Sequence, residues 1–204
     1  MLHRGSRLQV FRIAQGTPVW PGCALTMRKT LAGGVVIVFF ACVAFGGAPS
    51  QIRLESVGAR YGFGANDFSS AFHQAEAVVG FSLPWQWNLG AGWKLDSHLD
   101  LSLGRLGADG TDAFIGTLGP RLSLSRGNFP VTLECGVSPT WLSRDTFGRH
   151  DLGIPFQFAS HVGLAWHITR RFQVGYRLQH MSNAGLSRDN QGMNLHMFYV
   201  GCGF

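Results

Sequence analysis

The chain has 204 residues and a formal net charge of +6, yet only 14% of its residues are charged, whereas 28 are glycine, 16 are Phe and 6 are Trp. This length suits one domain, and low charge with abundant glycine and aromatic residues is not typical of a cytosolic enzyme. Nucleic-acid binding is not expected, because residues 1–50 hold five basic and no acidic residues, and beyond them 12 basic residues nearly balance 11 acidic ones.

Residues 1–48 have the pattern of an export signal. The basic segment Met27-Arg28-Lys29 precedes an apolar run over 31–43, and small residues follow. The run is too short for a membrane-spanning helix, which needs roughly 20 residues. We therefore expect residues 1–26 to be an over-extended start, Met27 to be the true start, and cleavage to fall near residues 46–48.

Four cysteines give no framework for a metal or disulfides. Cys23 and Cys42 lie in the leader, where a lipid anchor through Cys42 is an alternative although Phe39-Phe40-Ala41 before it fits poorly. Cys135 and Cys202 are far apart and lie in alternating segments. We expect them to be single buried or lipid-facing thiols, and we expect no metal or other cofactor.

After the leader, apolar and polar residues alternate with a period of two, which indicates β-strands with one apolar face. In the seventh expected strand, for example, Phe172, Val174, Tyr176 and Leu178 alternate with more polar residues. The pattern predicts eight strands, at 51–64, 71–87, 93–106, 112–125, 129–143, 153–168, 171–182 and 192–204.

These strands indicate a membrane barrel. Several exceed the usual 5–6 residues of a globular strand, and short links tend to alternate with longer, more polar ones. The chain also ends on an aromatic residue, Phe204. An exported soluble sandwich would show the same alternation, but these features favour an all-β, eight-stranded antiparallel transmembrane β-barrel over residues 49–204, in the Gram-negative outer membrane. Charges fall on the inward parity and should pair inside the barrel: Glu76, Asp96, Asp100, Arg121, Glu134 and Arg177.

Polar residues interrupt the apolar face near the end of the seventh strand. The outward parity of Leu178 continues to His180 and Ser182, where a polar side chain facing lipid is expensive. A hairpin centred near Ser187 would set Asn194 of the last strand opposite His180. The cluster would lie near the external membrane surface, beside lipopolysaccharide.

These residue types suit ester chemistry. A serine hydroxyl needs a neighbouring base, and the base needs a third group to orient it. His180 can serve Ser182 as that base, and Asn183 or the Gly185 amide could hold an oxyanion. The alternative is that polar residues at a barrel rim simply meet lipid head groups.

The segment from His180 to Leu186, together with Gly192 and Phe198-Tyr199, resembles the C-terminal signature of the lipid A 3-O-deacylases, the PagL family. Those proteins are eight-stranded outer-membrane barrels that remove the 3-position acyl chain from lipid A. The resemblance implies that His180 is the base, that Ser182 is the nucleophile and that Asn183 with Gly185 lies at the oxyanion. It implies lipid A as the substrate and no metal. Whether the protein forms a homodimer is left open by the sequence.

The sequence departs from the family where an acidic triad member is expected, because Asn194 stands there. An amide can fix the imidazole tautomer but cannot stabilise imidazolium by charge. Asp189 in the preceding loop is a candidate substitute, whereas His196 lies farther along the wall and is expected only to meet the membrane interface. Two rivals remain: an inactive barrel of the same ancestry with a structural or surface-binding role, and an outer-membrane phospholipase, although no acidic loop cluster for calcium is visible.

The mature protein should begin at residue 47, 48 or 49, because the small residues there follow the apolar run. Mass measurement of the protein extracted from outer membranes checks this. A mass that retains the apolar run over 31–43 would contradict the export signal.

Overall fold

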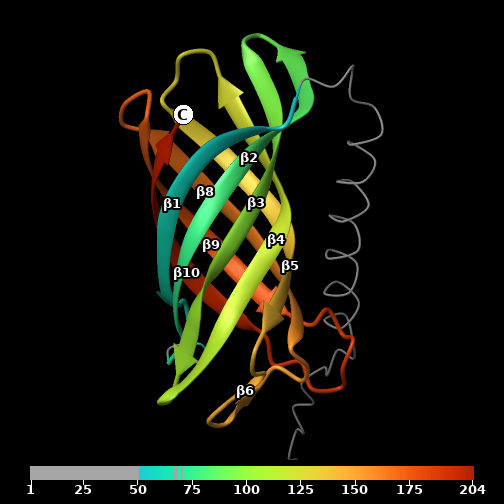
Figure 1. Ribbon diagram of the computed structural model, residues 1–204. Helices are drawn as coiled ribbons and strands as arrows, with labels where there is room; N and C mark the ends of the chain where they lie inside the picture. Colours follow the sequence, from blue (N-terminus) through green and yellow to red (C-terminus); the bar gives the residue numbers. More distant parts are fainter. Residues whose placement is uncertain (1–50, 67–68, 70) are drawn as a thin grey trace, which may run out of the picture.

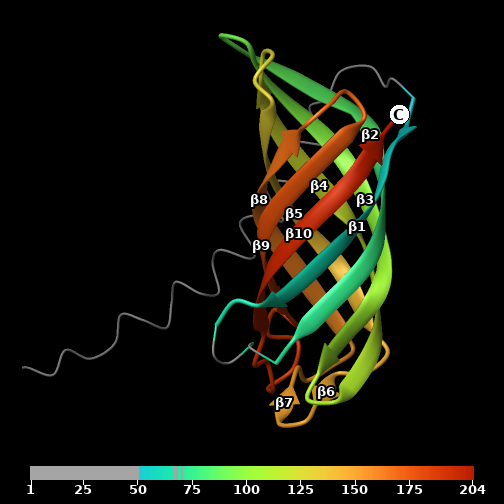
Figure 2. The same ribbon diagram turned by 90° about the vertical axis from the view of Figure 1, so that its left-hand side faces the viewer.

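The computed structural model describes residues 51–66, 69 and 71–204, so the leader and its expected cleavage lie outside the described residues. Eight long strands close into one antiparallel barrel (Figures 1 and 2). No helix in this part of the chain is long and apolar enough to cross a membrane. The barrel strands are β1 (Arg53–Gly64), β2 (His73–Gly90), β3 (Trp93–Ala108), β4 (Thr111–Arg126), β5 (Val131–Leu142), β8 (Phe156–His167), β9 (Phe172–Ser182) and β10 (Met193–Gly203).

The first and last strands close the barrel. β1 pairs with β10, with Val57 opposite Cys202 and Tyr61 opposite Phe198. The strand order around the wall is β1-β10-β9-β8-β5-β4-β3-β2. All eight predicted strands are confirmed, with ends that shift by a few residues. Closure leaves no unpaired strand edge in the wall, which is the arrangement that a barrel in lipid requires.

The connections differ between the two ends of the barrel. The C-terminus lies at the same end as the β2–β3, β4–β5 and β8–β9 turns (Figure 1). The opposite end, called here the loop end, carries an addition that the sequence did not predict: the short hairpin of β6 (Thr146–Phe147) and β7 (His150–Asp151). The link expected over 107–111 is instead a tight turn in which Asp109 and Gly110 both have positive φ.

The inner and outer faces of the wall differ as the alternation predicts. The free thiols of Cys135 and Cys202 are exposed, as expected for lipid-facing positions. Many large apolar side chains project outward, among them Leu103, Leu118, Leu133, Val162, Leu164, Phe198 and Val200. The outer face is therefore suited to lipid over most of the barrel.

Charged side chains fill the middle of the barrel in ion pairs. Arg121 lies 3.1 Å from Asp100 and 2.6 Å from Glu134. Glu76 lies 2.7 Å from Arg60 and 3.4 Å from Arg177. A cavity of about 40 Å³ remains among them, so the interior is packed rather than an open pore.

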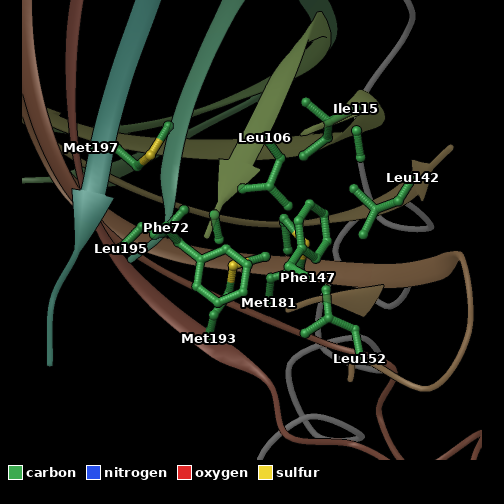
Figure 3. Packing of buried hydrophobic residues seen from close by; sticks show 13 residues of the cluster. Phe72, Leu106, Ile115, Leu142, Phe147, Leu152, Met181, Met193, Leu195 and Met197 are labelled. Carbon is green, nitrogen blue, oxygen red and sulfur yellow. The ribbon is translucent and has the colours of Figure 1, made fainter. Parts of the chain in front are cut away.

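The loop end of the barrel has an apolar interior (Figure 3). Strand residues that point inward meet residues from two loops, with Phe72 packed edge-to-face against Phe147 at 5.4 Å between ring centroids. The sequence did not reveal this cluster, because residues from two loops that are far apart in the chain complete it. Its large, fully buried members are Phe72, Leu106, Ile115, Leu142, Phe147, Leu152, Met181, Met193, Leu195 and Met197.

The interior charges predict a strong stability effect. Glu76→Gln should lower the free energy of unfolding by about 3–5 kcal/mol, because it leaves Arg60 and Arg177 without their shared carboxylate. Urea unfolding of the barrel in lipid vesicles measures this. The control is Asp112→Asn, which removes an exposed ion pair to Arg105 and should change stability little. Equal effects of the two substitutions would contradict the role given to the interior pairs.

Candidate active site

The polarity of the wall reverses where β9 and β10 approach the loop end. On β9, His180 and Ser182 point outward, while Met181 between them is fully buried inside. On β10, Asn194 and His196 have the outward parity, while Met193, Leu195 and Met197 are buried in the interior cluster. Most of the outer face is apolar, although the exposed Arg105–Asp112 ion pair and His73 are also polar and lie at the loop end. On β9 and β10 the polar side chains are neighbours on one face, and they form a polar site on the outside of the barrel.

The hairpin register joins His180 to Asn194. The two residues are cross-strand partners, as the sequence predicted. His180 Nδ1 lies 2.8 Å from Asn194 Oδ1. An amide oxygen at this position favours the tautomer with the proton on Nδ1, which leaves Nε2 unprotonated and able to act as a base.

Ser182 lies on the same outer face, two residues beyond His180. Both side chains approach Gly192: a Cβ atom there would lie 3.3 Å from His180 Cε1 and 3.4 Å from Ser182 Cβ. Within the part of the chain that the structure describes, Ser182 Oγ makes no hydrogen bond. Catalytic hydrogen bonds are often long without substrate, so this geometry is compatible with a serine and base that engage when substrate binds.

The interior cluster and the β1–β2 loop support the site from behind. Met181 and Met193 are cross-strand partners and pack side by side in the cluster (Figure 3). The backbone N–H of Ala65 donates to the backbone carbonyl oxygen of Asn194 at 2.8 Å, and the backbone N–H of Asn194 donates to Ser69 Oγ at 3.0 Å. These contacts hold the backbone at His180 and Asn194, and the sequence pattern did not point to them.

Asn183 and Gly185, the expected oxyanion residues, are engaged elsewhere. The side chain of Asn183 is fully buried, and its Nδ2 donates to the carbonyl oxygens of Leu152 and Asp189. The Gly185 amide donates to Asn183 Oδ1 at 2.9 Å. Neither residue donates toward Ser182 in this conformation, and their role at an oxyanion stays a prediction.

The other two polar candidates lie apart from the His180–Asn194 pair. His196 Nδ1 is 2.7 Å from the Tyr176 hydroxyl, and its ring packs against Phe63, as suits a residue at the membrane interface. Asp189 contributes its backbone carbonyl to Asn183, and its carboxylate forms no ion pair or hydrogen bond among the described residues. In this conformation the partner of His180 is the amide of Asn194.

Over residues 51–66, 69 and 71–204, no group of three or more His, Cys, Asp or Glu residues is arranged to hold a metal ion. The polar groups of Ser182, His180 and Asn194 are a hydroxyl, an imidazole and an amide. These are the groups of a serine, a base and an orienting residue.

The family described as "Lipid A 3-O-deacylase (PagL)" matches residues 73–202, a segment that runs from β2 to near the end of β10. The chain belongs to the PagL family. The lipid A deacylase PagL of Bordetella bronchiseptica (strain ATCC BAA-588 / NCTC 13252 / RB50) is 27% identical over 169 residues, which cover 79% of this chain and 89% of that relative.

The fold is also similar to a solved PagL structure. The crystal structure of the outer membrane enzyme PagL superposes with a TM-score of 0.63 at 20% identity, covering 72% of this chain and 97% of that one. The PagL-family match includes every site residue expected from the sequence, from His180 to Asn194. The family resemblance stated on the sequence is therefore confirmed.

Proposed function

We propose that this chain is a serine esterase that removes the 3-position ester-linked acyl chain from lipid A of lipopolysaccharide. The observation that carries the proposal is the outward His180–Asn194 hydrogen bond, with Ser182 beside it, on a wall whose outer face is mostly apolar. A polar cluster facing lipid is costly, and a substrate that is itself a lipid gives a reason for it.

The chain resides in the Gram-negative outer membrane, as its family and its barrel fold indicate. We propose that the apolar outer face is embedded in that membrane and that the loop end faces the cell exterior. Ser182 and His180 then lie near the outer surface, where the ester bonds of lipid A meet the acyl layer. The substrate reaches the site by lateral diffusion, without leaving the membrane.

The reaction divides into two steps. Ser182 Oγ attacks the ester carbonyl while His180 Nε2 takes the hydroxyl proton, and His180 then gives that proton to the departing sugar oxygen. The acyl chain stays on Ser182 until water, deprotonated by His180, attacks the acyl-enzyme. The bond between the acyl carbon and Ser182 Oγ then breaks, His180 returns the proton to Ser182 Oγ, and the fatty acid leaves. Asn194 Oδ1 holds the imidazole in the required tautomer throughout.

The second candidate is an inactive barrel of the same family, and Asn194 favours it. An amide accepts the hydrogen bond from Nδ1 but does not supply negative charge to the imidazolium that forms during the reaction. The intact geometry around His180 supports the esterase instead. A calcium-dependent phospholipase is less well supported, because the described residues contain no group of acidic side chains placed for a metal.

Removing either reacting group should abolish activity. Ser182→Ala and His180→Ala should each lower lipid A deacylation to background, since the two groups act as a unit. Release of fatty acid from lipid A by the purified, folded barrel measures this. The matched controls are Ser160→Ala, a serine beside His180 on β8, and His196→Ala, a histidine on the same wall. Near-normal activity of Ser182→Ala would refute the proposed nucleophile.

The absence of a carboxylate at position 194 should limit the rate of deacylation. Asn194→Glu should raise the deacylation rate several-fold or more, because a carboxylate would stabilise imidazolium. Loss of one electrostatic contact in a dry site costs roughly 10²–10³-fold, and this site is partly exposed, so the gain should be smaller. Initial rates on purified lipid A measure the effect.

Asp189→Asn is the control for that experiment. It should leave the rate unchanged if the Asn194 amide is the orienting group. An Asn194→Glu variant no faster than the parent, together with a strongly impaired Asp189→Asn variant, would transfer the third triad role to Asp189.

A further inference from the structure

We propose that Asn183 is a positioning residue that fastens the catalytic loop, residues 183–192, to the β6–β7 hairpin. This role would replace direct donation to an oxyanion by its side chain. The inference rests on the proposed esterase function, since that function makes the position of Ser182 matter. Ser182 directly precedes Asn183, so a displacement of the loop moves the nucleophile.

Both N–H donors of the Asn183 side chain are occupied, and its oxygen accepts one hydrogen bond. Nδ2 donates to the Leu152 carbonyl at 3.0 Å and to the Asp189 carbonyl at 2.7 Å, while Oδ1 accepts from the Gly185 amide at 2.9 Å. An amide has two N–H donors, and both are used here in a fully buried position. Donation to an oxyanion at Ser182 would have to break one of these two bonds. The Leu152 carbonyl would keep a second donor, Gln157 Nε2 at 3.1 Å, but either loss would release a contact between Asn183 and its surroundings.

The hairpin is a firm attachment point. Leu152 is fully buried in the interior cluster together with Phe147 and Phe72, so its carbonyl oxygen has a fixed position. A second bond joins the same two segments, because the Asp151 amide donates to Gln191 Oε1 at 3.0 Å. The catalytic loop is thus tied to the hairpin near its beginning and near its end.

The C-terminal end of the loop contacts the catalytic residues. Gly192 is buried and lies against His180 and Ser182, and it directly precedes Met193 on β10. The bonds to the hairpin at Asn183 and Gln191 therefore hold both ends of the loop. One end is next to Ser182, and the other leads into β10, which carries Asn194. Misplacement of reacting groups by about 1 Å can lower a rate about 100-fold. Greater mobility of this loop should therefore lower kcat.

Gly153 offers a way to disturb the attachment from the hairpin side, without touching the site. It has φ +84°, and a Cβ atom there would lie 2.9 Å from Asn183 Nδ2 and collide with the Asp189 carbonyl. Gly148 is a matched control in the same hairpin. It has φ +58°, so alanine meets a backbone penalty there too, but the three atoms nearest to its Cβ would all belong to the Asp109 side chain and none to the catalytic loop.

The experiment compares Asn183→Ala, Gly153→Ala, the double variant and Gly148→Ala in the full barrel. We measure kcat and KM on lipid A, and amide hydrogen exchange over residues 183–192. Asn183→Ala and Gly153→Ala should each lower kcat roughly 10–100-fold, change KM less, and speed exchange of the loop. The double variant should be no slower than the more impaired single variant, because both substitutions release the same attachment. Gly148→Ala should match the parent in both measurements.

Two results would overturn the proposal. If Asn183→Ala lowers kcat with unchanged exchange while Gly153→Ala keeps the parent rate, Asn183 acts on the oxyanion directly. If neither variant speeds exchange, the attachment does not hold the loop. A parent protein that does not deacylate lipid A would instead refute the proposed function and the catalytic half of this proposal, while faster exchange in both variants would still support the attachment.

Discussion

Closure of the β-sheet is the constraint on which the rest of this structure depends. In lipid every backbone N–H and C=O must find a partner within the protein, and a closed barrel provides one for each strand. Once β1 pairs with β10, the parity of each wall residue decides whether its side chain meets the interior or the surroundings. A polar residue on the outer face, such as His180, then needs an explanation in chemistry rather than in packing.

The interior is divided into two zones that serve different purposes. Ion pairs around Glu76 and Arg121 fill the middle of the barrel and satisfy the inward charges. At the loop end the interior becomes apolar, and Met181 and Met193 place their side chains there. Because neighbouring residues on a strand point to opposite faces, burial of these methionines turns His180, Ser182 and Asn194 outward. The apolar interior at the loop end and the polar site on the outer face therefore follow from the same alternation along β9 and β10.

Much of this arrangement could be predicted from the sequence, because it follows from a period of two. The eight strands and the pairing of His180 with Asn194 needed only parity and a hairpin centre. The β6–β7 hairpin and the buried contacts of Asn183 could not be predicted in this way. They depend on how loops distant in sequence pack against one another, as Leu152 and Asn183 do, and no local pattern encodes that. The same limit applies to Ser69, whose hydroxyl supports Asn194 across 125 positions of the chain.

The central claim is that the outward polar cluster is a working esterase despite the amide at Asn194. Mass spectrometry of lipid A from cells that produce the parent protein or Ser182→Ala at equal levels tests it most directly. The account predicts that lipid A loses one acyl chain, from the 3-position, only in cells with the parent protein. Fully acylated lipid A in both strains, with both proteins folded in the outer membrane, would contradict it.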